Sequence, residues 1–377
     1  MLRSRPAEIT YKVLAESIDR YGVTRLGSVT RLDTVGQATA TAVRLDPIKG
    51  SISNCSGRGD TELDARVGAL AEALERYCAE PRGRLPTILG RTSDLVGSFI
   101  PPAELIPARW FKPDGNLEWC AGKDLAGEKK WVPVNAVLFP YTPPASAGRI
   151  FRAHTHGLAV GSTWSEAVTF AILECIERDA YSRAVALATV GHGREIPVIA
   201  VDGAARFDDS IARILDAGLS IQLRDLSCDT SVPVVACTIG GGRFAHQGFC
   251  ANPDPRLALH GAVCEAAQSR LVDIQGARED FFEREDAVDE WFTTAGESPV
   301  IDLPSANDIP RTSEEALQWL SARLTAAKLP SPVVVDLSLD GVDMVAVRVV
   351  APMLETWAYD QERIGERARS WLSRSAR

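Results

Sequence analysis

The sequence predicts a mixed α/β fold in which long helices pack on a mixed β-sheet. Three long helices rich in apolar residues follow Gly-containing segments, and alternating apolar segments typical of strands lie between them. The 377 residues are 45% hydrophobic, enough for a large core, and no low-complexity segment or linker divides them. We therefore expect a single domain over 1–377, with a loop region rich in Pro and Trp at 85–150.

Composition and charge restrict the class of protein. The net charge of −9, with no run of Lys or Arg, argues against a protein that binds nucleic acid through a basic surface. The N-terminus lacks the apolar core of a signal peptide, and no apolar run approaches the length that crosses a bilayer, so we expect a cytoplasmic protein. The eight cysteines lie singly in the sequence, which indicates reduced thiols used as small apolar residues.

The elements can be placed in chain order. Residues 6–21 predict a helix, and 25–32 and 38–45 predict strands. A polar Gly loop at Gly57–Gly59 precedes a helix that Thr61 can cap. Short strands and long loops follow at 85–150. Thr163 can cap the central helix, and Glu166 three residues later would complete a capping box.

The second half of the chain continues this alternation. Strands are expected at 196–202, 220–227, 232–240, 331–338 and 342–352, with an amphipathic helix near 207–217. Asp254 and Pro255 provide the cap and the first position of the third long helix. Residues 281–330 are acidic and predict helix, and a basic helix ends the sequence.

The three long helices share one internal pattern. Eleven residues separate the cap from a glutamate in each helix: Thr61 from Glu72, Thr163 from Glu174, and Asp254 from Glu265. An acid or amide follows three residues later, and an arginine comes directly after it or one residue further on: Glu75 and Arg76, Glu177 and Arg178, Gln268 and Arg270. One such helix would be typical of a solvated, charge-paired face. Three copies in apolar helices favour a function, because burying unpaired carboxylates is costly.

Several carboxylates beside several arginines indicate a nucleoside triphosphate bound with Mg²⁺. Carboxylates bind the metal ion, and arginines contact phosphate oxygens directly. Eleven helical residues span roughly 16 Å, so phosphates near the glutamates cannot also lie at the N-terminus of the same helix. The middles of the helices must therefore converge on the site.

Other kinds of site are less well supported. The helices lack the Glu-x-x-His pattern of di-iron bundles, and the sequence has no phosphate loop of the G-x-x-x-x-G-K-[ST] kind. Gly240–Gly242 is better explained as a turn. His154 and His156 could be metal ligands, although a loop role is favoured because no matching Cys or His cluster lies nearby. No G-x-S-x-G motif supports acyl transfer.

The motifs together resemble the YcaO family. They are the segments GRG…GALAEALERY, THGLAVG…AILECIERDA, AVCEAAQSRLVDIQGARED and VVVDLS…VAVRVVAPMLE, which lie in order over about 50–360. The resemblance implies ATP-dependent activation of a peptide backbone amide. The amide oxygen takes the γ-phosphoryl group, a nucleophile adds at the carbon, and phosphate leaves. Azolines, amidines or thioamides in ribosomally made peptides result.

The resemblance also implies roles for individual residues, and it assigns no catalytic side chain. Mg²⁺ ligands are expected at Glu72, Glu75, Glu174, Glu177 and Glu265. ATP contacts are expected from Ser56, Gly57, Arg58, Arg76, Thr155, Arg178, Gln268, Arg270 and Arg278.

Three positions depart from the family pattern. Arg58 stands where Lys is usual, Gly68 where Ser precedes the first Glu, and Gly261 where Arg is common. The C-terminal segment lacks the P-x-P-x-P ending that marks azoline-forming cyclodehydratases. This favours a standalone member, or one with a TfuA-type partner as in thioamide formation.

The prediction is therefore an ATP- and Mg²⁺-dependent enzyme that acts on a precursor peptide, alone or with a TfuA-like or leader-binding partner. Nucleic acid and membrane are not expected as partners, and a homodimer is considered because related proteins are often dimers. Two alternatives stay open. One is a YcaO protein that acts on a cellular protein, and the other is a non-catalytic ATP-binding scaffold that presents a peptide to a partner.

Overall fold

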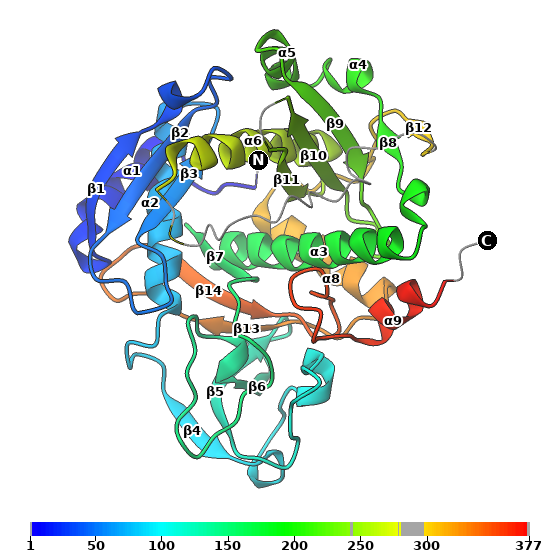
Figure 1. Cartoon of the computed structure of the whole chain (residues 1–377). Helices are drawn as coiled ribbons and strands as arrows, with labels where there is room; N and C mark the ends of the chain where they lie inside the picture. Colours follow the sequence, from blue (N-terminus) through cyan, green and yellow to red (C-terminus); the bar gives the residue numbers. More distant parts are fainter. Residues whose placement is uncertain (1, 242–243, 278, 280–297, 375–377) are drawn as a thin grey trace.

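A computed structural model describes residues 2–241, 244–277, 279 and 298–374 (Figure 1). Three β-sheets and several helices confirm the predicted mixed architecture. In Figure 1 the long helix α3 (Trp164–Thr189) crosses the centre of the molecule, with α6 (Pro255–Gln275) above it. Helix α2 (Glu62–Ala79) descends beside their ends. These are the three helices that carry the repeated Glu pattern.

The first sheet is an antiparallel meander in the order β1-β2-β3. Its strands are β1 (Val23–Ser28), β2 (Thr39–Arg44) and β3 (Asn54–Arg58). Helix α2 packs on this sheet, and α1 (Ala7–Glu16) packs on α2. The sequence predicted a loop at Gly57–Gly59. This prediction is wrong for Gly57 and Arg58, which belong to β3. Two glycines in a polar stretch suggested a turn, whereas the structure uses one of them for close packing.

The second sheet has five strands in the order β11-β10-β9-β8-β12. They are β8 (Val198–Ile199), β9 (Ser220–Asp225), β10 (Val234–Gly240), β11 (His246–Ala251) and β12 (Val300–Ile301). Helix α6 packs on β10 and β11, while α4 (Val201–Ala204) and α5 (Asp209–Asp216) adjoin β9. In both sheets, the strand before the long helix lies at a sheet edge, and that helix folds back onto it.

The third sheet has six strands, in the order β4-β5-β13-β14-β7 with β6 also paired to β5. They are β4 (Thr87–Gly90), β5 (Leu117–Asp124), β6 (Lys129–Pro133), β7 (Leu158–Gly161), β13 (Val333–Asp336) and β14 (Val345–Val350). Helix α3 packs on β7 and β14, and α8 (Ser313–Ala326) and α9 (Glu366–Leu372) pack on α3. The Pro- and Trp-rich region supplies β4, β5 and β6.

Glycines allow the two edge strands to approach their helices closely. A Cβ atom on Gly57 would lie 2.0 Å from the backbone nitrogen of Ala69 in α2. A Cβ atom on Gly248 would lie 2.2 Å from the backbone nitrogen of Ala266 in α6. Real atoms cannot approach so closely, so both positions require glycine. In each case, a glycine on an edge strand therefore allows close packing of a helix that carries one of the repeated glutamates.

Other sequence predictions meet the structure in part. Helix α3 is buried around most of its circumference, as its apolar run predicted. Of the predicted helical stretch 281–330, residues 313–326 are helical, residues 281–297 lie outside the described residues, and 300–301 form a strand. All eight cysteines are free thiols, and six of them are buried. Within the described residues, no helix combines the length and apolar character needed to cross a membrane.

Candidate functional site

Each of the three long helices begins at the cap predicted for it. The Thr61 and Thr163 side chains accept hydrogen bonds from the backbone N–H groups of Asp64 and Glu166, and Asp254 accepts one from Arg256. The predicted capping box at α3 is wrong in its second half. The Glu166 carboxylate instead binds the Arg3 guanidinium and the Ser4 N–H, each at 3.0 Å. The N-terminal segment is thereby held at the start of α3.

The middles of the three helices line one cavity of about 510 Å³. This volume falls in the range typical of small-molecule sites. Of the residues that the sequence predicted, the cavity brings together Ser56, Arg58, Glu72, Glu75, Arg76, Thr155, Glu174, Arg178, Glu265 and Gln268. The predicted convergence of the helix middles is therefore present in the structure.

On α2, Glu72 is held between the strand and the helix. One of its carboxylate oxygens accepts the Ser56 N–H of β3 at 2.7 Å, and the other binds the Arg76 guanidinium at 3.1 Å. Arg76 lies one helical turn after Glu72, which is the spacing at which such pairs meet. The arginine is thus oriented at the cavity wall before any ligand arrives.

The same arrangement recurs on α3. A Glu174 oxygen accepts the Gly157 N–H at 2.9 Å, and the other lies 3.4 Å from Arg178, one turn later. Arg178 also contacts Glu177 at 3.2 Å and donates to the Tyr359 hydroxyl at 2.8 Å. Two helices therefore present a Glu–Arg pair held by a backbone N–H, from β3 for Glu72 and from the turn before β7 for Glu174.

On α6 the arginine comes from another part of the chain. Arg58 of β3 contacts Gln268 at 2.8 Å and Glu265 at 3.1 Å. Arg270, which the pattern placed at this site, is not on the cavity wall, and its Nε binds Asp33 at 3.1 Å. Its predicted role at ATP is not supported by this position, because the helix turns the side chain toward β1 and β2.

Two carboxyl groups are held where ionisation is unfavourable. Burial, with repulsion from Glu174 and Glu72, raises the pKa of Glu75 to about 8, although its carboxylate accepts the Val160 N–H at 3.1 Å. Burial also raises the pKa of Glu177 to about 8, against the opposing effect of Arg178. Such carboxylates ionise readily once a cation is present. The donor set therefore fits Mg²⁺, and the arginines fit the phosphates of a nucleotide.

Two further predicted residues lie off the cavity wall, and a third is not described. Glu177 contacts Arg178 but does not line the cavity, and Gly57 acts in packing. Arg278 lies outside the described residues. The ligand roles assigned to these three stay predictions.

Sequence reasoning missed some residues of the cavity wall. Arg3 reaches it from the N-terminus, with its guanidinium 4.1 Å from the centre of the Phe170 ring. Gln247 of β11 and Ser269 of α6 also line it. The basic start of the chain was a signal for Arg3, but its partner Glu166 lies 163 residues away. No local pattern could have linked them.

The two glycines that replace expected side chains are both packed. A Cβ atom on Gly68 would lie 3.1 Å from Gly57 Cα, and one on Gly261 would lie 2.4 Å from Cys250 Sγ. Side chains at these positions would need neighbouring atoms to move. In this chain both positions serve helix–strand packing, with Cys250 occupying the space beside Gly261.

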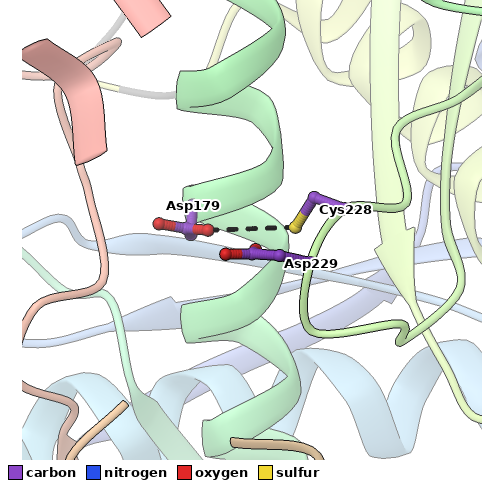
Figure 2. Close-up of side chains that lie close together, drawn as sticks. All are labelled: Asp179, Cys228 and Asp229. Carbon is purple, nitrogen blue, oxygen red and sulfur yellow. Dashed lines mark hydrogen bonds between the residues drawn. The ribbon is translucent and has the colours of Figure 1, made fainter. Parts of the chain in front are cut away.

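A group of Asp179, Cys228 and Asp229 resembles a metal site in its donor atoms (Figure 2). The cation there is Arg367, which bridges both carboxylates and lies 2.6 Å from Asp179. We therefore explain the group as a structural ion-pair cluster that ties α9 to α3.

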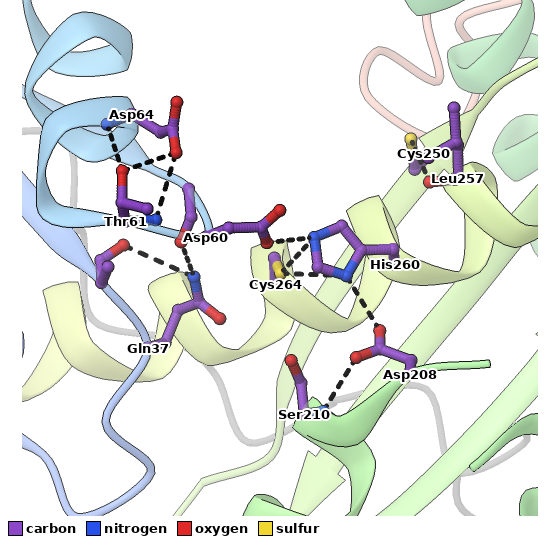
Figure 3. Close-up of polar contacts among 12 residues, drawn as sticks. Gln37, Asp60, Thr61, Asp64, Asp208, Ser210, Cys250, Leu257, His260 and Cys264 are labelled. Atoms are coloured by element: carbon purple, nitrogen blue, oxygen red, sulfur yellow. Dashed lines mark hydrogen bonds and ion pairs between the residues drawn. The ribbon is translucent and has the colours of Figure 1, made fainter. Parts of the chain in front are cut away.

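A second polar cluster lies where α6 meets the start of α2 (Figure 3). His260 contacts Asp60 at 2.8 Å through Nε2 and Asp208 at 3.1 Å through Nδ1. Hydrogen bonds to Asp208 and to Cys264 raise the pKa of His260 to about 11. The cationic ring of His260 thus joins α6 to the segment just before α2.

His154 and His156 are better explained as loop residues than as metal ligands. Their rings stack with centroids 4.6 Å apart, and His154 Nδ1 faces Arg348 at 3.2 Å. Burial and nearby cationic groups hold the pKa of both histidines well below its ordinary value.

Known proteins resemble this chain in sequence and in fold. Residues 56–355 match the family described as YcaO cyclodehydratase, ATP- and Mg²⁺-binding. The chain is 33% identical to an uncharacterized protein of Methanothermobacter thermautotrophicus, over 97% of this chain and 98% of that one. It is 29% identical to a protein encoded in the tfuA 3′ region of Rhizobium leguminosarum bv. trifolii, over 93% and 87%.

The fold is similar to that of YcaO from Methanopyrus kandleri bound with AMPPCP and Mg²⁺. The TM-score is 0.77 at 24% identity, covering 97% of this chain and 95% of the other. The extent of the family match decides the assignment: the chain belongs to the YcaO family, and ATP and Mg²⁺ are its cofactors, as its sequence predicted.

Proposed function

We propose that the protein activates a peptide backbone amide in an ATP- and Mg²⁺-dependent reaction during maturation of a ribosomally synthesised peptide. The amide oxygen attacks the γ-phosphorus of ATP, and ADP leaves. A nucleophile then adds to the amide carbon, and phosphate leaves with the former amide oxygen. The product is a thioamide or an azoline- or amidine-type group.

The observation that carries this proposal is the convergence on one cavity of carboxylates from three helices and of arginines from α2, α3 and β3. Phosphoryl transfer depends mostly on positioning and on neutralising charge, so it suits such a site. Glu72, Glu75, Glu174 and Glu265 would hold Mg²⁺, which supplies neutralisation of the phosphate charge. Arg58, Arg76 and Arg178 would contact phosphate oxygens.

The paired arrangement of these residues has a further consequence. Arg76 and Arg178 each already bind a glutamate one turn earlier, at 3.1 and 3.4 Å. Both side chains therefore lose little additional conformational freedom when phosphate binds. The two guanidinium groups already lie at the cavity wall. The N–H groups of Ser56 and Gly157 hold the paired glutamates in place.

A thioamide product with a TfuA-type partner is favoured within this class. The relative encoded in the tfuA 3′ region supports this choice, since it is similar over most of both chains. The alternatives, action on a cellular protein or a non-catalytic scaffold, lack a structural observation in their favour. Gly68 and Gly261, where the family pattern has larger side chains, are packed against neighbouring strands.

Phosphate release and product mass test the proposal together. We expect ATP turnover with Mg²⁺ and a substrate peptide, and its loss by about a hundredfold or more in Glu174→Gln. Glu62→Gln, the same change on an exposed part of α2 outside the cavity, should keep full turnover. ATP binding without turnover in every combination with candidate partners would instead support the scaffold. If turnover occurs, replacement of oxygen by sulfur identifies a thioamide, and loss of water identifies an azoline or a cyclic amidine.

A further inference from the structure

A second, smaller cavity lies beside the first and shares Arg178 with it. Its volume is about 50 Å³, and its wall includes Arg348, Arg363, His154 and His156. A cavity of roughly 10–15 Å³ already holds one water molecule, so this one has room for a few atoms but not for a nucleotide. Its position next to the nucleotide cavity makes its charge relevant to the reaction.

Two arginines of this wall are buried without an acid to neutralise them. Arg348 is 1% exposed and Arg363 is 5% exposed. Arg348 donates to the His154 carbonyl at 3.0 Å, and Arg363 donates to the carbonyls of Leu105 and Ile106 at 2.8 and 3.0 Å. Among the described residues, neither guanidinium forms an ion pair, and all these acceptors are uncharged.

Several N–H groups of these arginines also lack an acceptor. Arg348 Nε and Nη1, Arg363 Nη1 and Arg178 Nε are buried and have no hydrogen-bond partner among the described residues. Buried donors in folded proteins are nearly always paired, and buried charges are paired with an opposite charge. The buried Arg44 has its charge paired, since it binds Glu80 at 2.6 Å, although its Nε also lacks an acceptor among the described residues.

Asp360 and Glu355 lie near Arg363, and Glu174 lies near Arg348, but within the described residues none of these acids forms an ion pair with the two guanidinium groups. His154 and His156 are neutral or positive at any pH. Glu104 lines the cavity without forming an ion pair. Glu355 is occupied by the N–H groups of Gly365 and Ala368. The cluster therefore holds several buried guanidinium N–H groups that lack an acceptor among the described residues, in a small, partly apolar space.

We propose that this cavity binds one small monoanion, held by Arg348 and Arg363 beside the nucleotide site. The apolar part of its wall, which includes Phe151 and Leu354, favours a weakly hydrated ion or a single carboxylate group. The anion is either a free ion or the carboxylate of a bound peptide. Arg178 borders both cavities, so the bound anion lies next to the place where the phosphates are expected. This inference does not depend on the proposed reaction.

Thermal unfolding at constant ionic strength tests the site directly. Sodium formate replaces the sodium salt of a bulky sulfonate that is too large for the cavity. The melting temperature of the wild-type protein should rise with formate and reach a plateau, because binding to the folded state stabilises it. Arg348→Gln and, separately, Arg363→Gln should abolish the saturable rise.

Arg44→Gln is the matched control, because it removes a buried arginine outside the cavity. It should melt at a lower temperature, since Glu80 loses one of its two partners, yet it should keep the response to formate. Should neither cavity variant fold, crystals of the wild-type protein soaked in bromide decide the matter. An anomalous peak between Arg348 and Arg363 supports the site. Absence of both the peak and the wild-type response to formate would overturn it.

A second pair of probes identifies the source of the anion. Acetylglycine and acetylglycinamide share one backbone and differ in the carboxylate. Stabilisation by acetylglycine, but not by the amide, indicates a peptide carboxylate as occupant. Stabilisation by formate alone indicates a free ion. If none of the anions stabilises the wild-type protein beyond the sulfonate reference and the bromide soak shows no peak, the proposal is wrong.

Discussion

The Arg58 guanidinium of β3 lies 3.1 Å from the Glu265 carboxylate of α6, although 207 residues separate them in the sequence. The pair joins the first sheet to the helix of the second sheet, and Gln268 on α6 adds a contact at 2.8 Å. The two sides of the cavity are thus connected through a residue that also faces the expected phosphates. Changes at Arg58 should therefore alter both the affinity for the ligand and the contact between the first sheet and α6.

Arg58→Ala should weaken ATP binding by about tenfold, or about 1.4 kcal/mol, because it removes a cation and leaves Glu265 without its partner. Arg58→Lys should have an intermediate effect, since one ammonium keeps the charge but not the fork that reaches two acceptors. Titration calorimetry with ATP and Mg²⁺ measures both changes. Arg25→Ala, an exposed change on β1 of the same sheet, should bind ATP like the wild-type protein. Equal affinity of all four proteins would contradict a role for Arg58.

Glu75→Gln should separate ligand binding from stability. Glu75 lies partly buried beside Glu72 and Glu174, and its pKa of about 8 leaves it mostly protonated at neutral pH, so a neutral isostere costs the ligand-free protein little. We expect the ligand-free variant to melt no lower than the wild-type protein, while the rise in melting temperature caused by Mg²⁺ and ATP is lost.

Glu80→Gln is the contrasting variant for this experiment. It leaves the fully buried Arg44 without a carboxylate, which should reduce the free energy of unfolding by about 3–5 kcal/mol. Differential scanning calorimetry with and without Mg²⁺ and ATP measures both proteins. If Glu75→Gln destabilised the ligand-free protein as much as Glu80→Gln does, Glu75 would be structural.

The local signals of the sequence predicted the framework of the site. Caps at Thr61, Thr163 and Asp254 located the helices, because side-chain capping depends on a few neighbouring residues. The repeated spacing to Glu72 and Glu174 then placed the cavity at the helix middles, because helical rise is nearly constant.

Contacts between distant segments could not be predicted in this way. Arg270 was assigned to the site by its spacing, but Asp33, 237 residues away, binds it instead. Glu166 was expected to close a capping box, but the N-terminal Ser4 competes for it. Such choices depend on which segments the fold brings together. Arg348, buried and without an ion pair among the described residues, likewise lies in a strand that belongs to one of the family motifs, yet the motif assigned this arginine no role.

Gly57→Ala should strongly destabilise the protein, because its Cβ atom would overlap the backbone of α2. The nearest atoms would be Ala69 N at 2.0 Å and Ala65 O at 2.2 Å, and neither can move without displacing the helix. We expect a loss of about 3 kcal/mol in the free energy of unfolding, measured by urea denaturation. Gly27→Ala on β1 provides the control, since no atom lies within 4 Å of its added Cβ. Similar midpoints for the two variants would show that α2 and β3 are less tightly packed.

The bridge from His260 to Asp60 and Asp208 should give stability that depends on pH. Because the folded-state pKa of about 11 lies above the ordinary value near 6.5, the folded protein holds the proton more tightly. The stabilisation is therefore complete below about pH 6.5 and is lost as the pH rises toward 11. Asp208 has a pKa below its ordinary value, mainly through its hydrogen bonds to His260 and the Ser210 N–H, so it stays ionised across this window.

His260→Gln should accordingly lower the free energy of unfolding most at about pH 6.5, with a difference from wild type that shrinks steadily toward alkaline pH. Urea denaturation at several pH values measures this difference. A double-mutant cycle with Asp208→Asn isolates the pair, because the loss of the α5 cap appears in both backgrounds and cancels. The coupling energy between the two positions should decline over the same pH range. A difference that stays constant from neutral to alkaline pH would mean that His260 is neutral in the folded protein and joins α6 to α2 through packing alone.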